Sequence, residues 1–346
     1  MIYIFFIGII LFFSFLLIIY LIKEKIVVFL HFLTRVFETG NYFFSYRLFN
    51  KKQKVIKKKE LKRKFKEKFA IIIQGPLINE DNFTIETIKF YSNIYPEIPI
   101  IFSSWKRDID KIKNEKFKKK INFISNNLPS YSGYKNINLQ SVSSKNAISF
   151  AKKLGCKYVL KTRSDIRIYS LDFKDYLIDL IKFYKINKSV NLRQKERIIT
   201  TSFTLRYRLY GISDMVMFGN INDLYNYFNI MTTPKIEKKF LNFIVSLKFK
   251  DQTYFIQNEF CPEIYFFKEF FKKLRIKLKW TVNDNIKKIS ENFIIIDNQS
   301  LSIYWKKSNK VINHFSDRPM NTNMSLEFSF NDWLKNFYKS KKIKNL

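Results

Sequence analysis

The stretch KYVLKTRSDIRI, Lys157–Ile168, combines an apolar run with a cluster of ionisable side chains. Its first part, Tyr158–Leu160, has the composition of a short buried β-strand. The ionisable residues that follow are Lys161, Arg163, Asp165 and Arg167. Charged groups at the end of a buried strand are typical of open α/β sheets, which bind ligands outside the carboxyl ends of their strands. A carboxylate there can hold a metal ion and the cations can hold phosphate, although a surface salt-bridge cluster would give the same pattern.

The segments before this stretch alternate between strand and helix patterns. The predicted strands are Phe69–Ile73, Ile98–Trp105 and Ile121–Ser125, and the predicted helices begin at Thr84 and span Leu139–Leu154. This alternation predicts an α/β fold with a mostly parallel sheet and helices on its faces. The sequence contains neither a G-x-G-x-x-G motif nor a P-loop lysine motif, which argues against a dinucleotide dehydrogenase and a P-loop NTPase.

The composition indicates a folded protein whose excess of lysine reflects either an anionic partner or a coding bias toward Phe, Ile, Asn and Lys. The chain has 346 residues, 47% of them hydrophobic and 18% aromatic, so it can bury a core in one large or two small domains. Its formal net charge of +34 favours nucleic acid, a phospholipid surface or a phosphorylated substrate as partner without choosing between them. The two cysteines, Cys156 and Cys261, are interpreted as buried apolar side chains rather than as a disulfide framework.

The first residues predict a membrane anchor. Met1–Ile22 contains no charged side chain, and a helix of this length can cross a hydrocarbon core of about 30 Å. No small-residue cleavage site follows, so we expect a single-pass transmembrane helix instead of a signal peptide. Lys23 and Lys25 follow it, and the positive-inside rule places the rest of the chain on the cytoplasmic side of the membrane. The alternative is a buried helix of a soluble protein.

A basic linker is predicted between this anchor and the folded part. Ile26–Phe37 is apolar but too short to span, so we expect it at the membrane interface. From Lys51 to Lys68, 11 of 18 positions are Lys or Arg. Such a run gains about 1 kcal/mol per cation near anionic lipid, although a solvated linker helix would look the same. The predicted domains are an anchor at 1–22, a juxtamembrane linker at 23–68, a catalytic domain at 69–330 and a basic tail at 331–346.

Five motifs occur in order between Phe69 and the region of His314. They are IIIQGPL from Ile71, SSW from Ser103, NINLQSVSS from Asn136, YVLKTRSD from Tyr158 and LYGISDMVMFG from Leu209. Together they resemble the WavE lipopolysaccharide-synthesis family, regarded as glycosyltransferases with a GT-A-like (nucleotide-diphosphosugar transferase) fold. The resemblance implies transfer of a sugar from a nucleotide-sugar donor to a lipid-linked surface glycan, as in lipopolysaccharide or capsule biosynthesis.

The same resemblance raises the question of a divalent metal. GT-A enzymes bind the donor diphosphate through acids of a DxD motif at a strand end, usually with Mn²⁺ or Mg²⁺. Laid on that pattern, Arg163 and Ser164 replace the first two acids and Asp165 keeps the last. One carboxylate is a poor site for these ions, so metal binding by Asp165 needs help, for which His314 is the candidate. Alternatively, Arg163 and Lys161 bind the diphosphate directly and no metal is needed.

The resemblance also implies which residues face the donor. The residues expected to bind the nucleotide sugar or its diphosphate are Gln74, Gly75, Ser104, Trp105, Asn138, Gln140, Lys161, Arg163, Asp165 and Arg167. Trp105 can stack on the base, and the start of the helix before the central strand favours phosphate. The loop and helix residues among them can equally be turn or cap residues.

Two acids are candidates for the base that deprotonates the acceptor hydroxyl. Glu263 follows Pro262 at a predicted helix start and resembles the acid that opens the base-bearing helix of GT-A enzymes, although the second acid of that pair is Ile264 here. Asp214 precedes the apolar strand MVMF and resembles the acceptor-side segment. Each can also serve only as a helix or strand cap.

Three function classes therefore remain. The sequence favours a membrane-anchored glycosyltransferase. The second class is a catalytically degenerate GT-A-like scaffold of a polysaccharide assembly complex, and the third, nucleic-acid binding, lacks any recognised motif. In the basic tail, Trp333 and Phe337 at helical spacing indicate either a second membrane contact or a frayed end.

Overall fold

The computed structural model describes residues 68–117, 120–187, 193–205, 208–230, 261–306 and 327–342, together with Phe12 and Ser14. The chain divides into two compact units, one of 1–64 with 317–324 and one of 65–316 with 325–346, and every described strand belongs to the second. The predicted anchor and linker lie outside the described residues, except for Phe12, Ser14 and Lys68. The candidate metal ligand His314 lies outside them as well. Among the helices within the described ranges, none has both the length and the apolar character needed to cross a bilayer.

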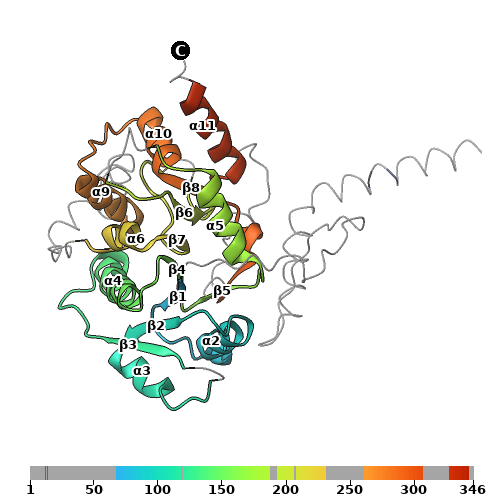
Figure 1. Ribbon diagram of the computed structural model, residues 1–346, viewed down its shortest axis with the longest axis vertical. Helices are drawn as coiled ribbons and strands as arrows, with labels where there is room; N and C mark the ends of the chain where they lie inside the picture. Colours follow the sequence, from blue (N-terminus) through green and yellow to red (C-terminus); the bar gives the residue numbers. More distant parts are fainter. Residues whose placement is uncertain are drawn as a thin grey trace, which may run out of the picture. The chain divides into compact units, whose positions relative to one another are not determined.

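A seven-stranded sheet forms the centre of this unit (Figure 1). Its order is β3 (Asn122–Asn126), β2 (Ile100–Trp105), β1 (Phe69–Gln74), β4 (Tyr158–Arg163), β7 (Met217–Asn220), β6 (Ile198–Thr201) and β8 (Phe293–Ile296). Strand β7 runs antiparallel to both of its neighbours, and every other pairing is parallel. The structure thus confirms the predicted α/β class with a mostly parallel sheet.

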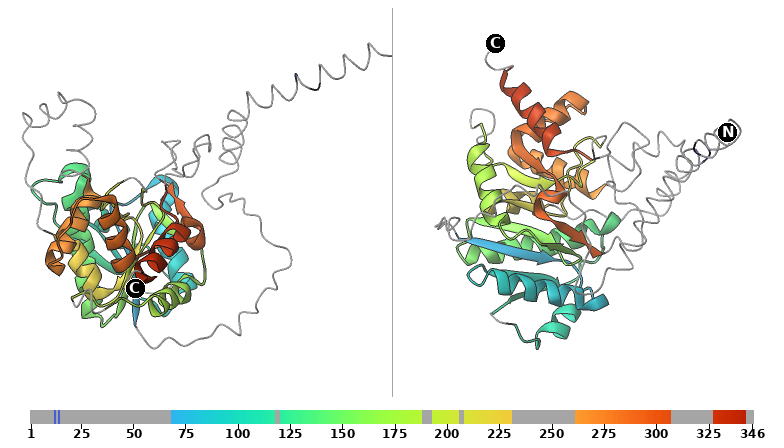
Figure 2. Two further views of the ribbon diagram at one scale, coloured as in Figure 1. Left: turned by 90° about the horizontal axis from the view of Figure 1, so that it is seen from above. Right: turned by 90° about the vertical axis from the view of Figure 1, so that its right-hand side faces the viewer.

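Helices cover both faces of the sheet, as Figure 1 and Figure 2 show. On one side lie α4 (Ile137–Lys153), α6 (Ile221–Phe228) and α9 (Pro262–Leu274), and on the other lie α2 (Phe83–Ile94) and α5 (Phe173–Phe183). The remaining helices are α3 (Lys106–Ile112), α10 (Val282–Asn292) and α11 (Phe330–Lys342), with short 3-10 turns at Glu80–Asn82, Tyr134–Asn136 and Asn298–Leu301. A sheet covered on both faces explains the continuous apolar runs of its strands. Every residue of β1 is buried, and Ile71 and Ile73 have no exposed surface.

A second, two-stranded sheet positions the end of the Lys157–Ile168 stretch. After β4 the chain turns at Ser164 and Asp165 and continues as β5 (Ile166–Ile168), which pairs antiparallel with β9 (Ile303–Trp305). Ile166 lies opposite Trp305, so the tryptophan comes beside the turn. The turn is also held to β1, because the Ser164 amide donates to the Gln74 carbonyl at 2.9 Å.

The C-terminal helix α11 belongs to the core, unlike the basic tail expected from the sequence. Trp333 and Phe337 are 0% and 4% exposed, and their rings lie 4.9 and 5.2 Å from the ring of Tyr184. The Trp333 indole also donates to the Phe293 carbonyl of β8 at 2.8 Å. The apolar side of this helix therefore packs on the sheet, and neither a frayed end nor a membrane contact describes these two residues.

Candidate functional site

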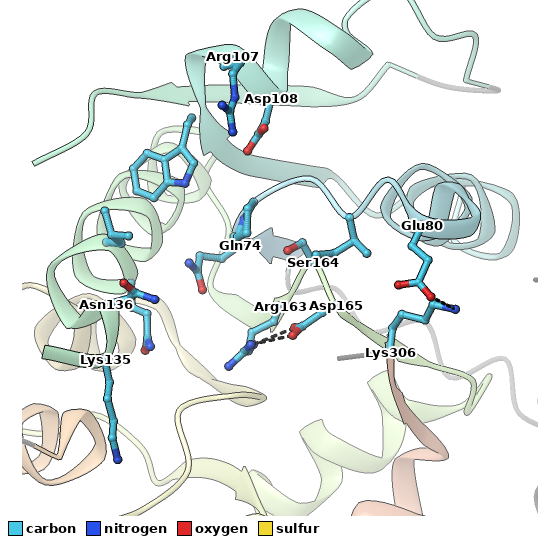
Figure 3. A pocket seen from close by; sticks show the side chains of 16 residues that line it. Gln74, Glu80, Arg107, Asp108, Lys135, Asn136, Arg163, Ser164, Asp165 and Lys306 are labelled. Atoms are coloured by element: carbon cyan, nitrogen blue, oxygen red, sulfur yellow. Dashed lines mark hydrogen bonds and ion pairs between the residues drawn. The ribbon is translucent and has the colours of Figure 1, made fainter. Parts of the chain in front are cut away.

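A pocket of about 640 Å³ opens where β1, β2 and β4 end (Figure 3). The residues that line it are Gln74, Gly75, Pro76, Ile78, Glu80, Trp105, Arg107, Asp108, Lys135, Asn136, Leu139, Gln140, Arg163, Ser164, Asp165 and Lys306. Because the three strands run parallel, their carboxyl ends meet at one edge of the sheet, where open α/β sheets bind ligands.

The floor of the pocket is the loop that follows β1. The Gln74 side-chain amide donates to the Ser143 hydroxyl of α4 at 2.8 Å, and the Gly75 backbone N–H donates to the Ser103 carbonyl at 3.1 Å. Gly75 has φ +127°, and a Cβ atom there would lie 2.7 Å from the Ser164 Oγ. Glycine is required at this position because the loop and the turn after β4 approach each other closely.

Replacing Gly75 by alanine is expected to lower the free energy of unfolding by about 1–3 kcal/mol from backbone strain alone. The contact with Ser164 adds to this cost. Gly155→Ala is the matched control, because Gly155 also has a positive φ of +74° but has no atom closer than 3.8 Å to the added Cβ. Chemical denaturation would measure both. The close-approach explanation would be contradicted if both variants lost the same free energy of unfolding. It would also be contradicted if adding Ser164→Ala to Gly75→Ala restored no stability.

The wall beyond β2 carries an indole and an acid. Trp105 lines the pocket, and α3 follows it directly with Arg107 and Asp108. The Asp108 Oδ2 accepts hydrogen bonds from the Leu77 amide at 3.1 Å and from the Ser104 hydroxyl at 2.9 Å. Ser104, which was predicted to contact the nucleotide, does not line the pocket, since its side chain has no exposed surface and its hydroxyl donates to Asp108.

The start of α4 forms a third wall. Lys135 and Asn136 are exposed and have positive φ angles of 47° and 66°, and the helix begins at the next residue. Gln140 lines the pocket from the first turn, and its buried Oε1 has no hydrogen-bond partner. Asn138 does not line the pocket, contrary to its predicted role. It is 1% exposed, and its amide holds the preceding loop by donating to the Tyr131 carbonyl at 3.1 Å.

Arg163 and Asp165 form a two-pronged ion pair in the middle of the pocket (Figure 3). The Arg163 Nε and Nη2 donate to Asp165 Oδ1 at 2.8 Å and to Oδ2 at 2.7 Å, and the Trp305 indole N–H donates to Oδ2 at 3.0 Å. Burial lowers the pKa of the Arg163 guanidinium, but the charge and hydrogen bonds of Asp165 outweigh burial and raise the pKa overall. The guanidinium is therefore a permanent cation.

The predicted metal site at Asp165 does not fit this arrangement. A carboxylate has about four lone-pair positions, and three of those of Asp165 already accept hydrogen bonds. Within the part of the chain that the structure describes, no three His, Cys, Asp or Glu residues gather as a metal site would require. Its predicted partner His314 lies outside the described residues, so the metal site stays a prediction, which this hydrogen-bonded arrangement of Asp165 does not favour.

Two of the predicted phosphate-binding cations lie away from the pocket. Lys161 is two residues deeper in β4 than Arg163 and has no exposed surface. Its Nζ donates to the Asp214 carbonyl oxygen at 2.5 Å and lies 3.8 Å from the carboxylate Oδ2. Burial lowers the Lys161 pKa to about 8, although Asp214 opposes this shift. Arg167 lies in β5 and donates to the Thr87 hydroxyl at 2.9 Å, so neither side chain can reach a diphosphate.

The two candidate bases are not among the residues that line the pocket. The Glu263 carboxylate accepts from the Cys261 thiol at 2.7 Å and lies 3.3 Å from Arg208. The Asp214 pKa is raised overall, because burial and the charge of Glu263 raise it more than the charge of Lys161 lowers it. The charges of Asp214 and Glu263 both raise the Arg163 pKa.

Several lining residues were not expected from the sequence: Glu80, Arg107, Asp108, Lys135, Asn136, Ser164 and Lys306. Arg107 and Asp108 directly follow a predicted strand, so the carboxyl-edge rule could have found them. Lys306 had no local signal. It reaches the pocket because β9 pairs with β5, and it is held there by Asp81 at 2.5 Å and Glu80 at 3.5 Å.

No family model matches the sequence, and no curated protein matches it either, so the resemblance to the WavE family remains a prediction. Similar solved structures include a 4-diphosphocytidyl-2C-methyl-D-erythritol synthase from Anaerococcus prevotii, at 12% identity and a TM-score of 0.35, covering 80% of this chain and 99% of that chain. A cytidylyltransferase from Leptospira borgpetersenii has 13% identity and a TM-score of 0.31, covering 80% and 96%. A mannose-1-phosphate geranyltransferase from Thermus thermophilus has 10% identity and a TM-score of 0.26, covering 42% and 44%.

At these levels of similarity, the function has to be inferred from the site. The structure shows an α/β protein with a pocket at the carboxyl edge of a mostly parallel sheet, the edge where open α/β sheets bind ligands. The site combines an indole, directed carboxylates and cations.

Proposed function

We propose that this protein is a glycosyltransferase that takes its sugar from a nucleoside diphosphate donor bound in the pocket. The observation that carries the proposal is the convergence of Trp105 from the end of β2, Asp108 from α3 and Arg163 from the end of β4 onto one cavity. Its volume of about 640 Å³ lies within the range of small-molecule sites. An aromatic face, a hydrogen-bond acceptor and fixed cations are what a base, a ribose and a diphosphate require.

Each part of the donor has a matching group. The Trp105 indole offers a stacking face for the base. The Asp108 Oδ2 is held by the Leu77 amide and Ser104, which fixes the carboxylate so that its other oxygen can accept an N–H or O–H from the nucleoside. Arg163 lines the pocket and would bind the diphosphate. The first turn of α4, which also lines the pocket, favours phosphate as a helix N-terminus does.

The acceptor hydroxyl is activated by Glu263. Its side chain is 30% exposed, whereas that of Asp214 is 8% exposed and is occupied by Lys161. In the transfer step the hydroxyl oxygen bonds to the sugar carbon while the bond from that carbon to the diphosphate oxygen breaks. The hydroxyl proton moves to Glu263, and the electron pair leaves with the nucleoside diphosphate.

The acceptor we propose is a lipid-linked surface glycan at the cytoplasmic face of the inner membrane. The uncharged stretch Met1–Ile22 and the 11 cations between Lys51 and Lys68 support this part of the proposal. An anchored enzyme with a basic linker is held close to an acceptor that is itself embedded in an anionic lipid surface.

The proposal predicts that one nucleoside diphosphate raises the melting temperature of the full chain. A ligand at a hundred times its Kd stabilises by about 2.7 kcal/mol, a shift of a few degrees. Trp105→Ala should weaken this binding by about 1–3 kcal/mol, the usual contribution of base stacking. Trp280→Ala, at a partly exposed tryptophan outside the pocket, is the control.

The informative measurement is a thermal shift with uridine, cytidine, guanosine and adenosine diphosphates and their sugars. A shift with one base that Trp105→Ala reduces and Trp280→Ala leaves unchanged would support the proposal. No shift with any nucleotide would contradict it and would favour a scaffold protein with a degenerate site.

A further inference from the structure

We infer that Arg163, positioned by Asp165, takes the place of a divalent cation at the leaving diphosphate. This inference rests on the proposed function, since it concerns the donor bound in the same pocket. It assigns Asp165 the role of a positioning residue rather than that of a metal ligand.

The geometry of the ion pair is the first argument. Arg163 and Asp165 are two residues apart across the turn between β4 and β5, and the two guanidinium contacts measure 2.8 and 2.7 Å. A bidentate arginine–carboxylate pair fixes the plane of the guanidinium as well as its position. Asp165 is itself held by the Trp305 indole, whose ring centre lies 5.9 Å from the Arg163 guanidinium carbon.

The second argument is the set of donors that remains. Arginine has five N–H groups, and two of them are directed at Asp165. The Arg163 side chain is 26% exposed and lines the pocket, so its remaining N–H groups can reach a ligand there. Because these donors are fixed before the nucleotide sugar binds, they can stabilise charge that develops on the leaving oxygen without reorganisation.

The third argument concerns net charge. The Arg163–Asp165 pair is formally neutral, Lys306 is outnumbered by Glu80 and Asp81, and Asp108 adds a further carboxylate to the lining, so these groups cannot neutralise a diphosphate. Arg107 and Lys135 also line the pocket, and neither forms a salt bridge with a described residue. Figure 3 shows them on different sides of the pocket, with Arg163 between them. They supply the cationic field, and Arg163 supplies directed hydrogen bonds.

The alternative is a metal ion held by Asp165, as in GT-A enzymes with a DxD motif. While the carboxylate keeps its contacts with Arg163 and Trp305, it can offer such an ion at most one lone-pair position, which is a poor metal site. The metal would also lie next to a permanent cation, which Coulomb repulsion opposes. The two arrangements therefore compete for this carboxylate and can be distinguished by experiment.

The test is calorimetric titration of the full chain with the nucleoside diphosphate that gives a thermal shift, first in EDTA and then with Mn²⁺. We expect the same Kd in both. Arg163→Ala should weaken binding of the diphosphate by about 10- to 100-fold, the effect of losing hydrogen bonds to a charged group, and leave binding of the corresponding nucleoside unchanged. Arg275→Ala, at an exposed arginine after α9, is the matched control and should bind like the wild type.

Asp165→Asn separates positioning from metal binding. The variant should keep diphosphate binding in EDTA but release nucleoside diphosphate from the nucleotide sugar at least about tenfold more slowly, because Arg163 is no longer fixed at the leaving group. The inference would be overturned, and the proposed function left standing, by the following result. EDTA abolishes diphosphate binding by the wild type, and Mn²⁺ restores binding to the wild type but not to Asp165→Asn. Absence of nucleotide binding in the wild type under both conditions would overturn the proposed function and this inference with it.

Discussion

Replacing Lys161 by methionine is expected to lower the free energy of unfolding by about 3–5 kcal/mol, the cost of breaking a buried ion pair from one side. Lys161 has no exposed surface, its ammonium group donates to the Asp214 carbonyl, and it lies 4.8 Å from the centre of the Phe228 ring. Without it, the buried Asp214 carboxylate has lost its nearest cation. Denaturant unfolding of the full chain near neutral pH would measure the loss.

A second substitution makes this prediction specific to the ion pair. In Lys161→Met with Asp214→Asn the uncompensated charge is gone, so most of the lost stability should return, since apolar or neutral replacements of buried pairs are often nearly neutral. Lys152→Met is the control, because Lys152 is an exposed residue of α4 and surface substitutions usually stay within about 0.5 kcal/mol. A double variant as unstable as Lys161→Met would show that the ammonium hydrogen bond to the Asp214 backbone carbonyl, and not the ion pair, holds the structure together.

Replacing Glu263 by glutamine is expected to slow turnover of the nucleotide sugar by about 10²–10⁴-fold, the usual contribution of a general base. The amide keeps the shape of the side chain and can still accept a hydrogen bond from Cys261, but it cannot take up a proton. Since Glu263 does not line the donor pocket, the Kd of the nucleoside diphosphate should not change. Release of nucleoside diphosphate with water or glycan as acceptor would measure turnover.

The control for this variant lies on the same helix. Glu269 belongs to α9, and its nearest cation is Lys272 at 3.8 Å, so Glu269→Gln should keep normal turnover. Full activity of Glu263→Gln together with loss of activity in Asp214→Asn would exclude Glu263 as the base and transfer the role to Asp214. The thermal stability of Asp214→Asn would have to be compared as well, because that substitution also leaves Lys161 without its counter-charge.

The amino-acid sequence alone determined the layered α/β architecture and the edge of the sheet at which the site lies. Runs such as Phe69–Ile73 have to be buried on both faces, and the chain direction of successive strand–helix units makes their carboxyl ends coincide. Gln74, Trp105 and Arg163 each stand at the end of such a run, so their presence in one pocket followed from strand ends and required no knowledge of side-chain contacts.

The tertiary structure decided which of the charged residues face the ligand. Lys161 and Arg163 have similar local sequence environments, but a difference of two residues in depth makes the first a buried structural cation and the second a lining residue. Asp165 is directed to Arg163 and Trp305, and the tryptophan comes from 140 residues later in the chain. Such partners depend on the pairing of β5 with β9. Periodicity and polarity are local signals. The partner of a buried charge, in contrast, depends on which distant element packs beside it and supplies the hydrogen bonds that offset the cost of burial.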